Sequence, residues 1–182
     1  MDILDIIKKR RSVRDYSERK VEKNKLFKVL EAGRWSPSSG NVQNWRFIVV
    51  TNSRLKMQLA ESCLGQYWLT SVPVIIVVAS DDSKLRMLFG QRGERYYSIQ
   101  NCSVAMMSMM LQAQSLGLNS SWVGVFDEEK VKRVLKITDP NFSVRGLIAI
   151  GYASKVPPPP RRLDLDKLVF FNQFGNSIFK EE

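Results

Sequence analysis

Residues 72–79 form a continuous apolar run rich in Val and Ile, and this run constrains the fold more than any other segment. Its length suits a β-strand and falls well short of the roughly 18 apolar residues that a membrane-spanning helix needs. A strand that is apolar on both faces has to be covered on both faces. We therefore expect a sheet with residues 72–79 at its centre and helices packed against each side.

The rest of the chain alternates between helical and strand patterns, as a covered sheet requires. Apolar residues at spacings of three and four predict helices over residues 2–10, 24–34, 55–64, 97–116 and 127–136. Segments rich in β-branched and aromatic residues predict further strands over residues 45–51, 122–126 and 144–152. This order predicts an α+β or α/β class, and a chain of 182 residues is the size of one domain, residues 1–182.

The C-terminal segment departs from this pattern. Four prolines at residues 157–160 predict a stiff extended stretch, and residues 163–179 are rich in Leu, Val and Phe without a clear period. A segment this short cannot form a core alone. We expect it to lie on its own domain or on a partner subunit.

The amino-acid composition excludes several kinds of active site. The chain has no histidine and only two cysteines, which excludes a Ser-His-Asp triad, a Cys–His pair, histidine-ligated zinc and a cysteine-rich metal cluster. A bound cofactor would therefore have to carry out the difficult step of any enzymatic reaction. The 28 Lys and Arg residues against 18 Asp and Glu give a formal net charge of +10, which favours anionic ligands.

The sequence also predicts a location. No segment is apolar for long enough to span a bilayer, so no membrane partner is expected. The first residues lack the basic, apolar and small-residue regions of a signal peptide. We expect a cytoplasmic protein in which Cys63 and Cys102 are free, buried thiols.

Arginines near both ends of the chain are candidates for binding phosphate. They form two groups: Arg10, Arg11, Ser12 and Arg14 after the first predicted helix, and Arg161 and Arg162 after the prolines. Guanidinium groups match phosphate oxygens in a bidentate manner, although a solvated basic surface is the alternative. Neither a glycine-rich dinucleotide fingerprint nor a Walker sequence is present, so phosphate binding would depend on these arginines.

Two further segments place small and polar residues beside a predicted strand. Residues 37–45, Pro-Ser-Ser-Gly-Asn-Val-Gln-Asn-Trp, offer backbone groups and amide side chains that suit the edge of a flat heterocycle, although an ordinary turn is the alternative. Residues 117–126 join the longest predicted helix to a strand, which a simple helix stop explains in part. Gly124 inside that strand pattern indicates a close approach by another group.

Taken together and in this order, the four segments resemble the FMN-dependent nitroreductase family. The matching stretches are Arg-Arg-Ser-Val-Arg-Asp-Tyr at residues 10–16, Ser-Pro-Ser-Ser-Gly-Asn-Val-Gln-Asn-Trp-Arg-Phe at 36–47, Leu-Gly-Leu-Asn-Ser-Ser-Trp-Val-Gly at 116–124, and the pair Arg161 and Arg162. The resemblance spans nearly the whole chain. Asn44 stands where the family often has proline, and Asn101 stands where many members have an acidic residue.

The resemblance implies an α+β fold with a mixed β-sheet wrapped by helices, in an intertwined homodimer. The long helix would lie at the subunit interface, and residues 157–182 would form a C-terminal extension that packs on the partner subunit. FMN would bind at the interface as the cofactor. NADH or NADPH would be the electron donor.

Carried over to this sequence, the resemblance assigns three sets of cofactor-binding residues. The phosphate, ribityl and pyrimidine side of FMN would contact Arg10, Arg11, Ser12 and Arg14, with Arg161 and Arg162 adding to the phosphate contacts. The partner subunit would line the flavin ring with Pro37, Ser38, Ser39, Asn41 and Gln43. The backbone of Gly124 and Val125 would face the flavin N5. No catalytic side chain and no metal ligand is implied, because the chemistry is that of the flavin.

The implied function is that of an FMN-dependent oxidoreductase that accepts hydride from NAD(P)H and reduces nitroaromatic, quinone or flavin-type acceptors. Two alternatives stay open. One is a specialised flavin-dependent dehydrogenase or reductase of the same fold that acts on another substrate. The other is a basic nucleic-acid-binding module, which the charge alone suggests. No recognised nucleic-acid motif accompanies that charge, so no nucleic-acid partner is expected.

Overall fold

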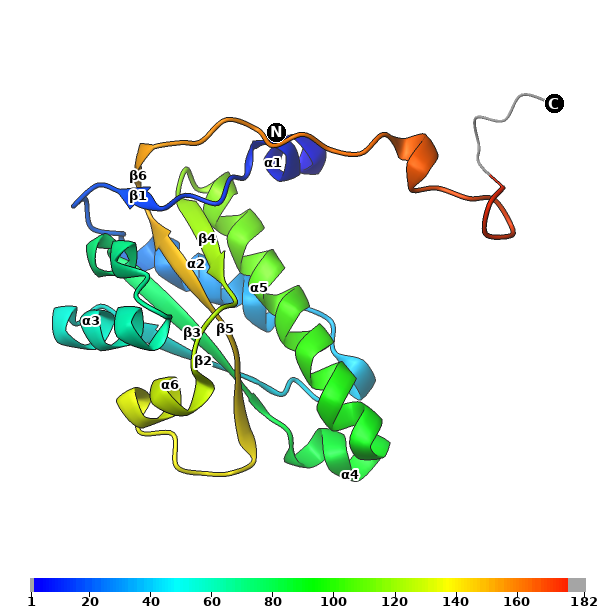
Figure 1. The fold of residues 1–182 in the computed structure, drawn as a ribbon, viewed down its shortest axis with the longest axis horizontal. Coiled ribbons are helices and arrows are strands. Elements are labelled where there is room, and N and C mark those ends of the chain that lie inside the picture. Colours follow the sequence, from blue (N-terminus) through cyan, green and yellow to red (C-terminus); the bar gives the residue numbers. More distant parts are fainter. Residues whose placement is uncertain (1, 177–182) are drawn as a thin grey trace.

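The computed structural model describes residues 2–176, and a four-stranded antiparallel sheet forms its centre. Figure 1 shows the strands in the order β2 (Trp45–Val50), β3 (Val74–Asp81), β5 (Phe142–Gly151) and β4 (Asn119–Val123). Strand β3 pairs with β2 on one side and with β5 on the other. The central strand predicted over residues 72–79 is confirmed. It begins after Pro73, which has no N–H for strand pairing.

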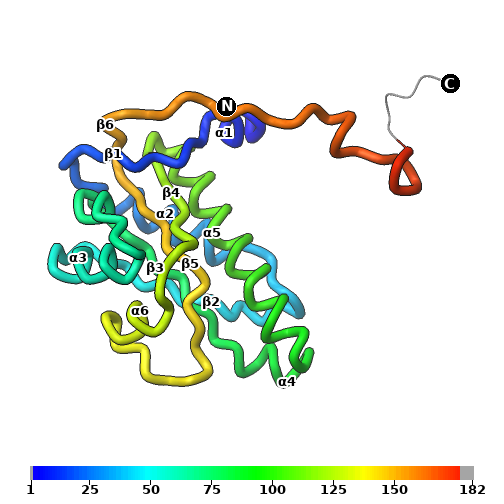
Figure 2. Tube along the Cα trace, in the orientation of Figure 1, coloured from blue at the N-terminus to red at the C-terminus, as the bar shows by residue number. Residues whose placement is uncertain are grey.

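Helices cover both faces of this sheet, as Figure 2 also shows. They are α3 (Ser53–Ser62) and α6 (Glu128–Leu135) on one face, and α2 (Lys23–Arg34) and α5 (Ser98–Ser115) on the other. The helices predicted over residues 2–10, 24–34, 55–64, 97–116 and 127–136 are therefore confirmed, with small shifts of their ends.

Alternate side chains of β3 divide between the two apolar layers. Ile75 and Val77 belong to the layer under α3 and α6, whereas Ile76 and Val78 belong to the layer under α2 and α5. All four side chains are fully buried. Each buried side chain of this size contributes roughly 1.5–3 kcal/mol to stability. The predicted α+β class, with helices wrapped around a sheet, is confirmed.

The N-terminal segment reaches the edge of the sheet at β4. Helix α1 (Ile3–Lys9) is followed by an isolated parallel bridge between Ser12 and Ser120 of β4. The next residues form β1 (Asp15–Tyr16), which pairs antiparallel with β6 (Ala153–Lys155) in a small second sheet. The parallel bridge makes the pairing around the central sheet mixed.

The strand predicted over residues 122–126 is wrong in its bounds. Strand β4 covers Asn119–Val123 and pairs with the C-terminal half of β5. Its first residues are small and polar and therefore do not look like a strand, yet Ser120 and Ser121 are buried. Gly124 consequently lies just beyond the strand and not within it.

The C-terminal segment leaves the body of the molecule. In Figures 1 and 2 the chain after β6 passes α1 and then extends away, with a short 3-10 turn, η4 (Leu165–Lys167). The end of the predicted apolar segment, residues 177–179, and of the predicted extension, residues 177–182, lies outside the described residues. Among residues 2–176, no helix combines the length and the apolar character that crossing a membrane requires.

A kinked helix connects β3 to α5. The polar residues 81–96 carry no helix prediction, but the structure forms α4 (Ser83–Arg92) there, followed by a π turn, η3 (Gly93–Tyr97). Gly90 interrupts α4 with φ 59° and ψ −149°, a conformation that glycine adopts without a Cβ clash. Gly93 then packs closely on α4, because an added Cβ would lie 2.3 Å from the carbonyl oxygen of Leu85.

We predict that Gly93→Ala lowers the free energy of unfolding by about 1–3 kcal/mol, because the new methyl group displaces backbone of α4. Urea denaturation measures this change. The exposed neighbour Gln91 provides a control, and Gln91→Ala should change stability by less than about 0.5 kcal/mol. Equal stability of the two variants would contradict the packing described for Gly93.

Candidate functional site

Three cationic side chains from opposite ends of the described chain converge beside α1: Arg10, Arg11 and Arg162, here called the arginine cluster. Arg10 is half-buried, and its Nη1 is a buried atom without a hydrogen-bond partner among residues 2–176. Burial, followed by the charges of Arg162 and Arg11, lowers the pKa of the Arg10 guanidinium. Because a buried charge without an acceptor is costly, the cluster has the chemistry of an anion-binding site.

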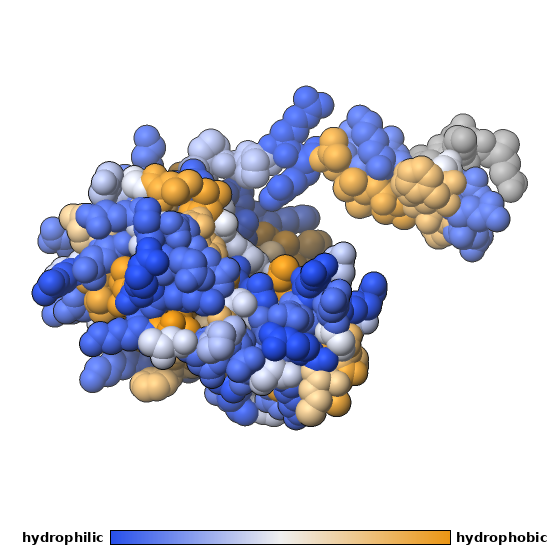
Figure 3. All heavy atoms as spheres, turned by 60° about the horizontal axis from the view of Figure 1, so that its bottom comes forward, coloured by the Kyte–Doolittle hydropathy of each residue, from blue (hydrophilic) through white to orange (hydrophobic). Residues whose placement is uncertain are grey.

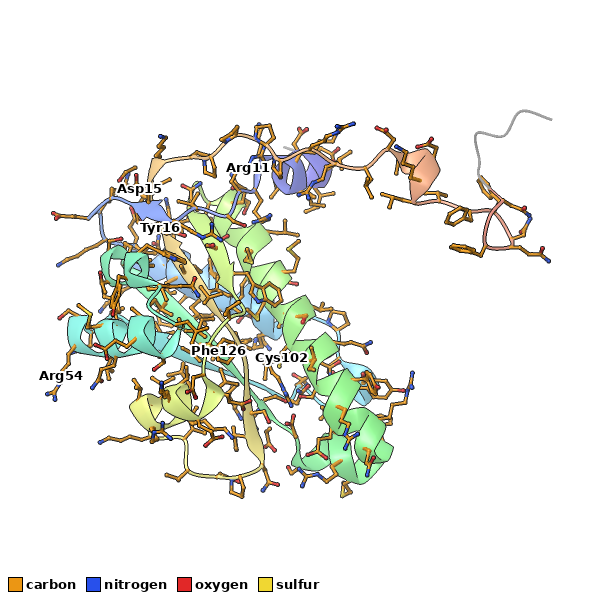
Figure 4. The ribbon with its side chains drawn as sticks, viewed as in Figure 1. Arg11, Asp15, Tyr16, Arg54, Cys102 and Phe126 are labelled. Atoms are coloured by element: carbon orange, nitrogen blue, oxygen red, sulfur yellow. The ribbon has the colours of Figure 1, made fainter. Side chains whose placement is uncertain are left out.

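A cavity of about 380 Å³ opens beside Arg11 and Arg162, two members of this cluster. It is lined by Ile7, Lys8, Arg11, Pro159, Pro160 and Arg162, a set that includes three cations and no carboxylate. Nη1 of Arg11 donates to the carbonyl oxygens of Lys8 at 2.5 Å and of Arg10 at 2.8 Å, which holds this side chain in place. Figure 4 shows Arg11 where the chain after β6 passes α1.

Backbone hydrogen bonding to β4 fixes the orientation of residues 12–14, which complete the N-terminal arginine segment. The N–H of Val13 donates to the carbonyl oxygen of Ser120 at 3.2 Å, and the Val13 side chain is fully buried. Side chains alternate along an extended backbone, so Ser12 and Arg14 point away from the core, and both are exposed. Arg161 is exposed as well.

The loop over residues 37–43 is tied to α5. Oδ1 of Asn101 accepts hydrogen bonds from the backbone N–H of Ser39 at 3.0 Å and from its hydroxyl at 3.2 Å. Within the loop, the N–H of Gln43 donates to Oγ of Ser38 at 3.0 Å. These bonds leave Ser38 and Ser39 half-buried.

The backbone of loop 37–43 adopts an unusual conformation. Left-handed φ angles occur at Gly40 (57°), Asn41 (53°) and Gln43 (50°). Glycine and asparagine tolerate this region well, whereas glutamine adopts it less readily. Pro37, Asn41 and Gln43 are exposed, so the loop presents polar groups at the surface of the molecule.

The arginine cluster and loop 37–43 lie at opposite ends of α5. Ser39 contacts Asn101 near the start of this helix, whereas Ser12 bridges Ser120, which follows the end of the helix. The stretch from Asn101 to Ser115 spans about 21 Å at 1.5 Å per residue. Within one chain, the two sets therefore lie apart and do not line one pocket.

Gly124 follows β4 at roughly 13 Å from Ser120, at about 3.3 Å per residue of extended chain, and Val125 comes next. Both residues are exposed. An added Cβ on Gly124 would have Nε1 of Trp122 as its nearest neighbour at 3.6 Å, so the backbone is open to an approaching group. The carbonyl oxygen of Val125 accepts from Nε2 of Gln66 at 3.1 Å.

Sequence reasoning misses a buried polar network behind loop 37–43. Nδ2 of Asn101 donates to Oδ1 of Asn44 at 2.8 Å, and Nδ2 of Asn44 donates to Oγ of Ser80 at 2.6 Å. Ser80 donates to Asp82, whose Oδ2 pairs with Nη2 of Arg145 at 2.6 Å. The signal that could have found this network is Asn101 itself, an amide on the apolar face of the longest helix.

Comparison with known proteins agrees with this fold. The model of the Nitroreductase family matches residues 7–68 and 63–152, which together cover most of the chain. The chain is thus an α+β protein with a cluster of arginines beside α1, and it belongs to the Nitroreductase family. The family resemblance predicted from the four sequence segments is confirmed.

Individual relatives match along most of their length. An FMN-dependent nitroreductase from Clostridium difficile R20291 is 31% identical, with a TM-score of 0.81 over 94% of this chain and 99% of that chain. A nitroreductase family protein from Clostridium difficile 630 is 32% identical, with a TM-score of 0.83 over 95% and 99%. An NADH dehydrogenase from Thermus thermophilus is 30% identical, covering 90% of this chain and 92% of its own length.

We predict that Arg145→Met destabilises the protein by about 3–5 kcal/mol, because it leaves the Asp82 carboxylate buried and uncompensated. The Asp82 side chain is only 3% exposed. Arg46→Met is the control, since it breaks an exposed pair with the adjacent Asp81 at 3.2 Å and should cost less than about 1 kcal/mol. Urea denaturation measures both, and similar losses would contradict the burial argument.

Proposed function

We propose that this protein is an FMN-dependent oxidoreductase that accepts hydride from NADH or NADPH and passes electrons to nitroaromatic, quinone or flavin-type acceptors. Relatives described as an FMN-dependent nitroreductase and an NADH dehydrogenase support this reaction class. We also propose that the working unit is a homodimer. Residues 1–182 would form one FMN-binding domain, and residues 157–182 would extend onto the partner.

The observation that carries this proposal is the buried, unpartnered Nη1 of Arg10 beside Arg11 and Arg162. A phosphate monoester carries a charge of about −1.5 to −2 at neutral pH and three acceptor oxygens. The phosphate of FMN would supply an acceptor for the half-buried Arg10 guanidinium and offset the repulsion among the three guanidinium groups. Charge-assisted hydrogen bonds of this kind are roughly twice as strong as neutral ones.

The other predicted residues would contact the rest of the cofactor. FMN, when bound, supplies the two-electron chemistry for which this chain has no side chain of its own. Exposed Ser12 and Arg14 would face the ribityl and pyrimidine side, where the Arg14 cation favours negative charge on the ring. Gly124 has no side chain to block the ring, and loop 37–43 of the partner would cover it from the other side.

Exposed apolar side chains support the pairing of two copies. Ile99, Val104 and Met107 lie on the outer side of α5, and each is more than 40% exposed. The C-terminal segment adds exposed residues of the same kind, namely Leu163, Leu165, Leu168, Phe171 and Phe174. Figure 3 shows this apolar segment standing apart from the body. Grouped exposed apolar surface of this extent indicates an interaction site.

The function is tested by adding FMN to the purified protein, removing free FMN and recording the absorbance spectrum. The proposal expects retained flavin absorbance that NADH or NADPH bleaches without oxygen and that a nitroaromatic or quinone restores. Nitroaromatics, quinones and free flavin, compared at one concentration, rank the acceptors. A protein that retains no flavin at saturating FMN would refute the proposal.

We predict that Arg10→Ala and Arg162→Ala each weaken FMN binding by about 10- to 100-fold, since each removes charged hydrogen bonds to the phosphate. Lys9→Ala is the control, because it removes the same charge from the exposed end of α1 outside the cavity. Quenching of FMN fluorescence gives the dissociation constants. If all three variants weakened FMN binding to a similar extent, the affinity would depend on the net charge of the protein and not on a specific phosphate site.

We predict a solution mass of twice the 20.9 kDa chain. Phe174 is 92% exposed in the single chain, and the proposed dimer would bury it against the partner. Phe174→Asp should therefore raise the dimer dissociation constant by about tenfold or more. Met57→Asp, on α3 at 45% exposure, should leave the mass unchanged. Sedimentation velocity at several concentrations distinguishes these cases, and a monomeric parent would refute the dimer.

A further inference from the structure

Asn101 joins loop 37–43 to the core by three hydrogen bonds. Its Oδ1 receives both donors of Ser39, and its Nδ2 donates to Asn44. Asn101 is only 4% exposed and Asn44 only 2%. Both polar groups of the Asn101 amide are therefore engaged, and two of its bonds go to one loop residue.

Asn101 lies on the buried face of α5, where an amide side chain costs free energy that an apolar side chain would not. The neighbouring residues on the buried face of α5 are apolar, among them Cys102, Ala105 and Met106. Asparagine is a poor helix former, and burying an amide costs free energy unless it is hydrogen-bonded. An apolar residue at 101 would fit the layer but would leave the N–H of Ser39 without its acceptor.

The far end of the network holds Asn44 in a defined orientation. Nδ2 of Asn44 points to Ser80, and Ser80 contacts both Asp82 and Ser98. Asp82 and Ser98 in turn receive bonds from Arg145 at 2.6 and 2.9 Å. Asn44 therefore presents its oxygen to Asn101, and this orients the oxygen of Asn101 towards the loop.

We propose that Asn101 is a positioning residue that acts through Ser39 to hold loop 37–43 in the conformation that contacts the flavin ring of the partner's site. This inference rests on the proposed function. The loop needs such support because Gly40, Asn41 and Gln43 have left-handed backbone angles, which an unanchored loop would exchange for more favourable ones.

The test compares Asn101→Ala with Ser108→Ala in the full-length protein. Ser108 lies on the same helix, and its hydroxyl receives a 2.9 Å bond from Ser36, outside loop 37–43. Asn101→Ala should weaken FMN binding by about tenfold through loss of the two Ser39 bonds. It should also speed hydrogen exchange of the Ser39 amide by about tenfold in the FMN-free protein. Ser108→Ala should change neither quantity.

Two further variants distinguish the loss of the Ser39 hydrogen bonds from a general loss of folding. Asn101→Leu fills the volume of the amide and should repeat both effects without leaving a cavity. In its protonated form, Asn101→Asp keeps an oxygen acceptor for Ser39 and an O–H donor for Oδ1 of Asn44, so at acidic pH it should restore slow exchange and most of the FMN affinity of the parent at the same pH.

The outcomes separate this inference from the proposed function. If the parent binds FMN and Asn101→Ala and Asn101→Leu bind it equally well, the positioning role is wrong and the function stands. If both variants lose affinity but Asn101→Asp does not recover it at acidic pH, the role through Ser39 is also wrong. If the parent itself binds no FMN, the proposed function fails and this inference fails with it.

Discussion

Strand β3 places large apolar side chains on both faces, and the cost of leaving either face in water organises the rest of the molecule. That cost requires helices on both sides of the sheet, and α5 is the longest of those described. Once α5 lies along the sheet, its two ends become fixed points about 21 Å apart, from Asn101 to Ser115. Loop 37–43 attaches at one end, and the N-terminal arginine segment reaches β4 near the other.

Two charged side chains, Asp82 and Arg10, differ in how their charges are compensated within the chain. The buried charge of Asp82 is neutralised within the chain by Arg145. Arg10 is instead half-buried, with a buried Nη1 that has no acceptor among residues 2–176, and it lies beside two more guanidinium groups. The phosphate of the proposed FMN would place an anion beside this second charge. The cavity lined by Arg11 and Arg162 lies there.

Most of the fold and part of the site could be predicted from the sequence, because periodic apolar patterns survive in a single chain. The β3 run and the α5 pattern predicted the sheet and its cover. Strand β4 was misplaced, since Ser120 and Ser121 are polar and their burial depends on tertiary packing. The roles of Asn44, Ser80 and Arg145 were also missed. These residues lie far apart in the sequence, so no local sequence pattern indicates that they form one hydrogen-bond network. The arginines were found because both groups are conspicuous. Their convergence was expected from the family resemblance, and the structure places Arg162 beside Arg10 and Arg11.

A crystal structure of the protein with FMN would show directly whether the arginine cluster holds the phosphate. We predict a phosphate oxygen within hydrogen-bond distance of the Arg10 guanidinium, with Arg162 of the same protomer on another oxygen. We also predict that loop 37–43 of the second protomer lies over the ring. A phosphate bound away from Arg10, or a ring covered by the loop of the same protomer, would refute this arrangement.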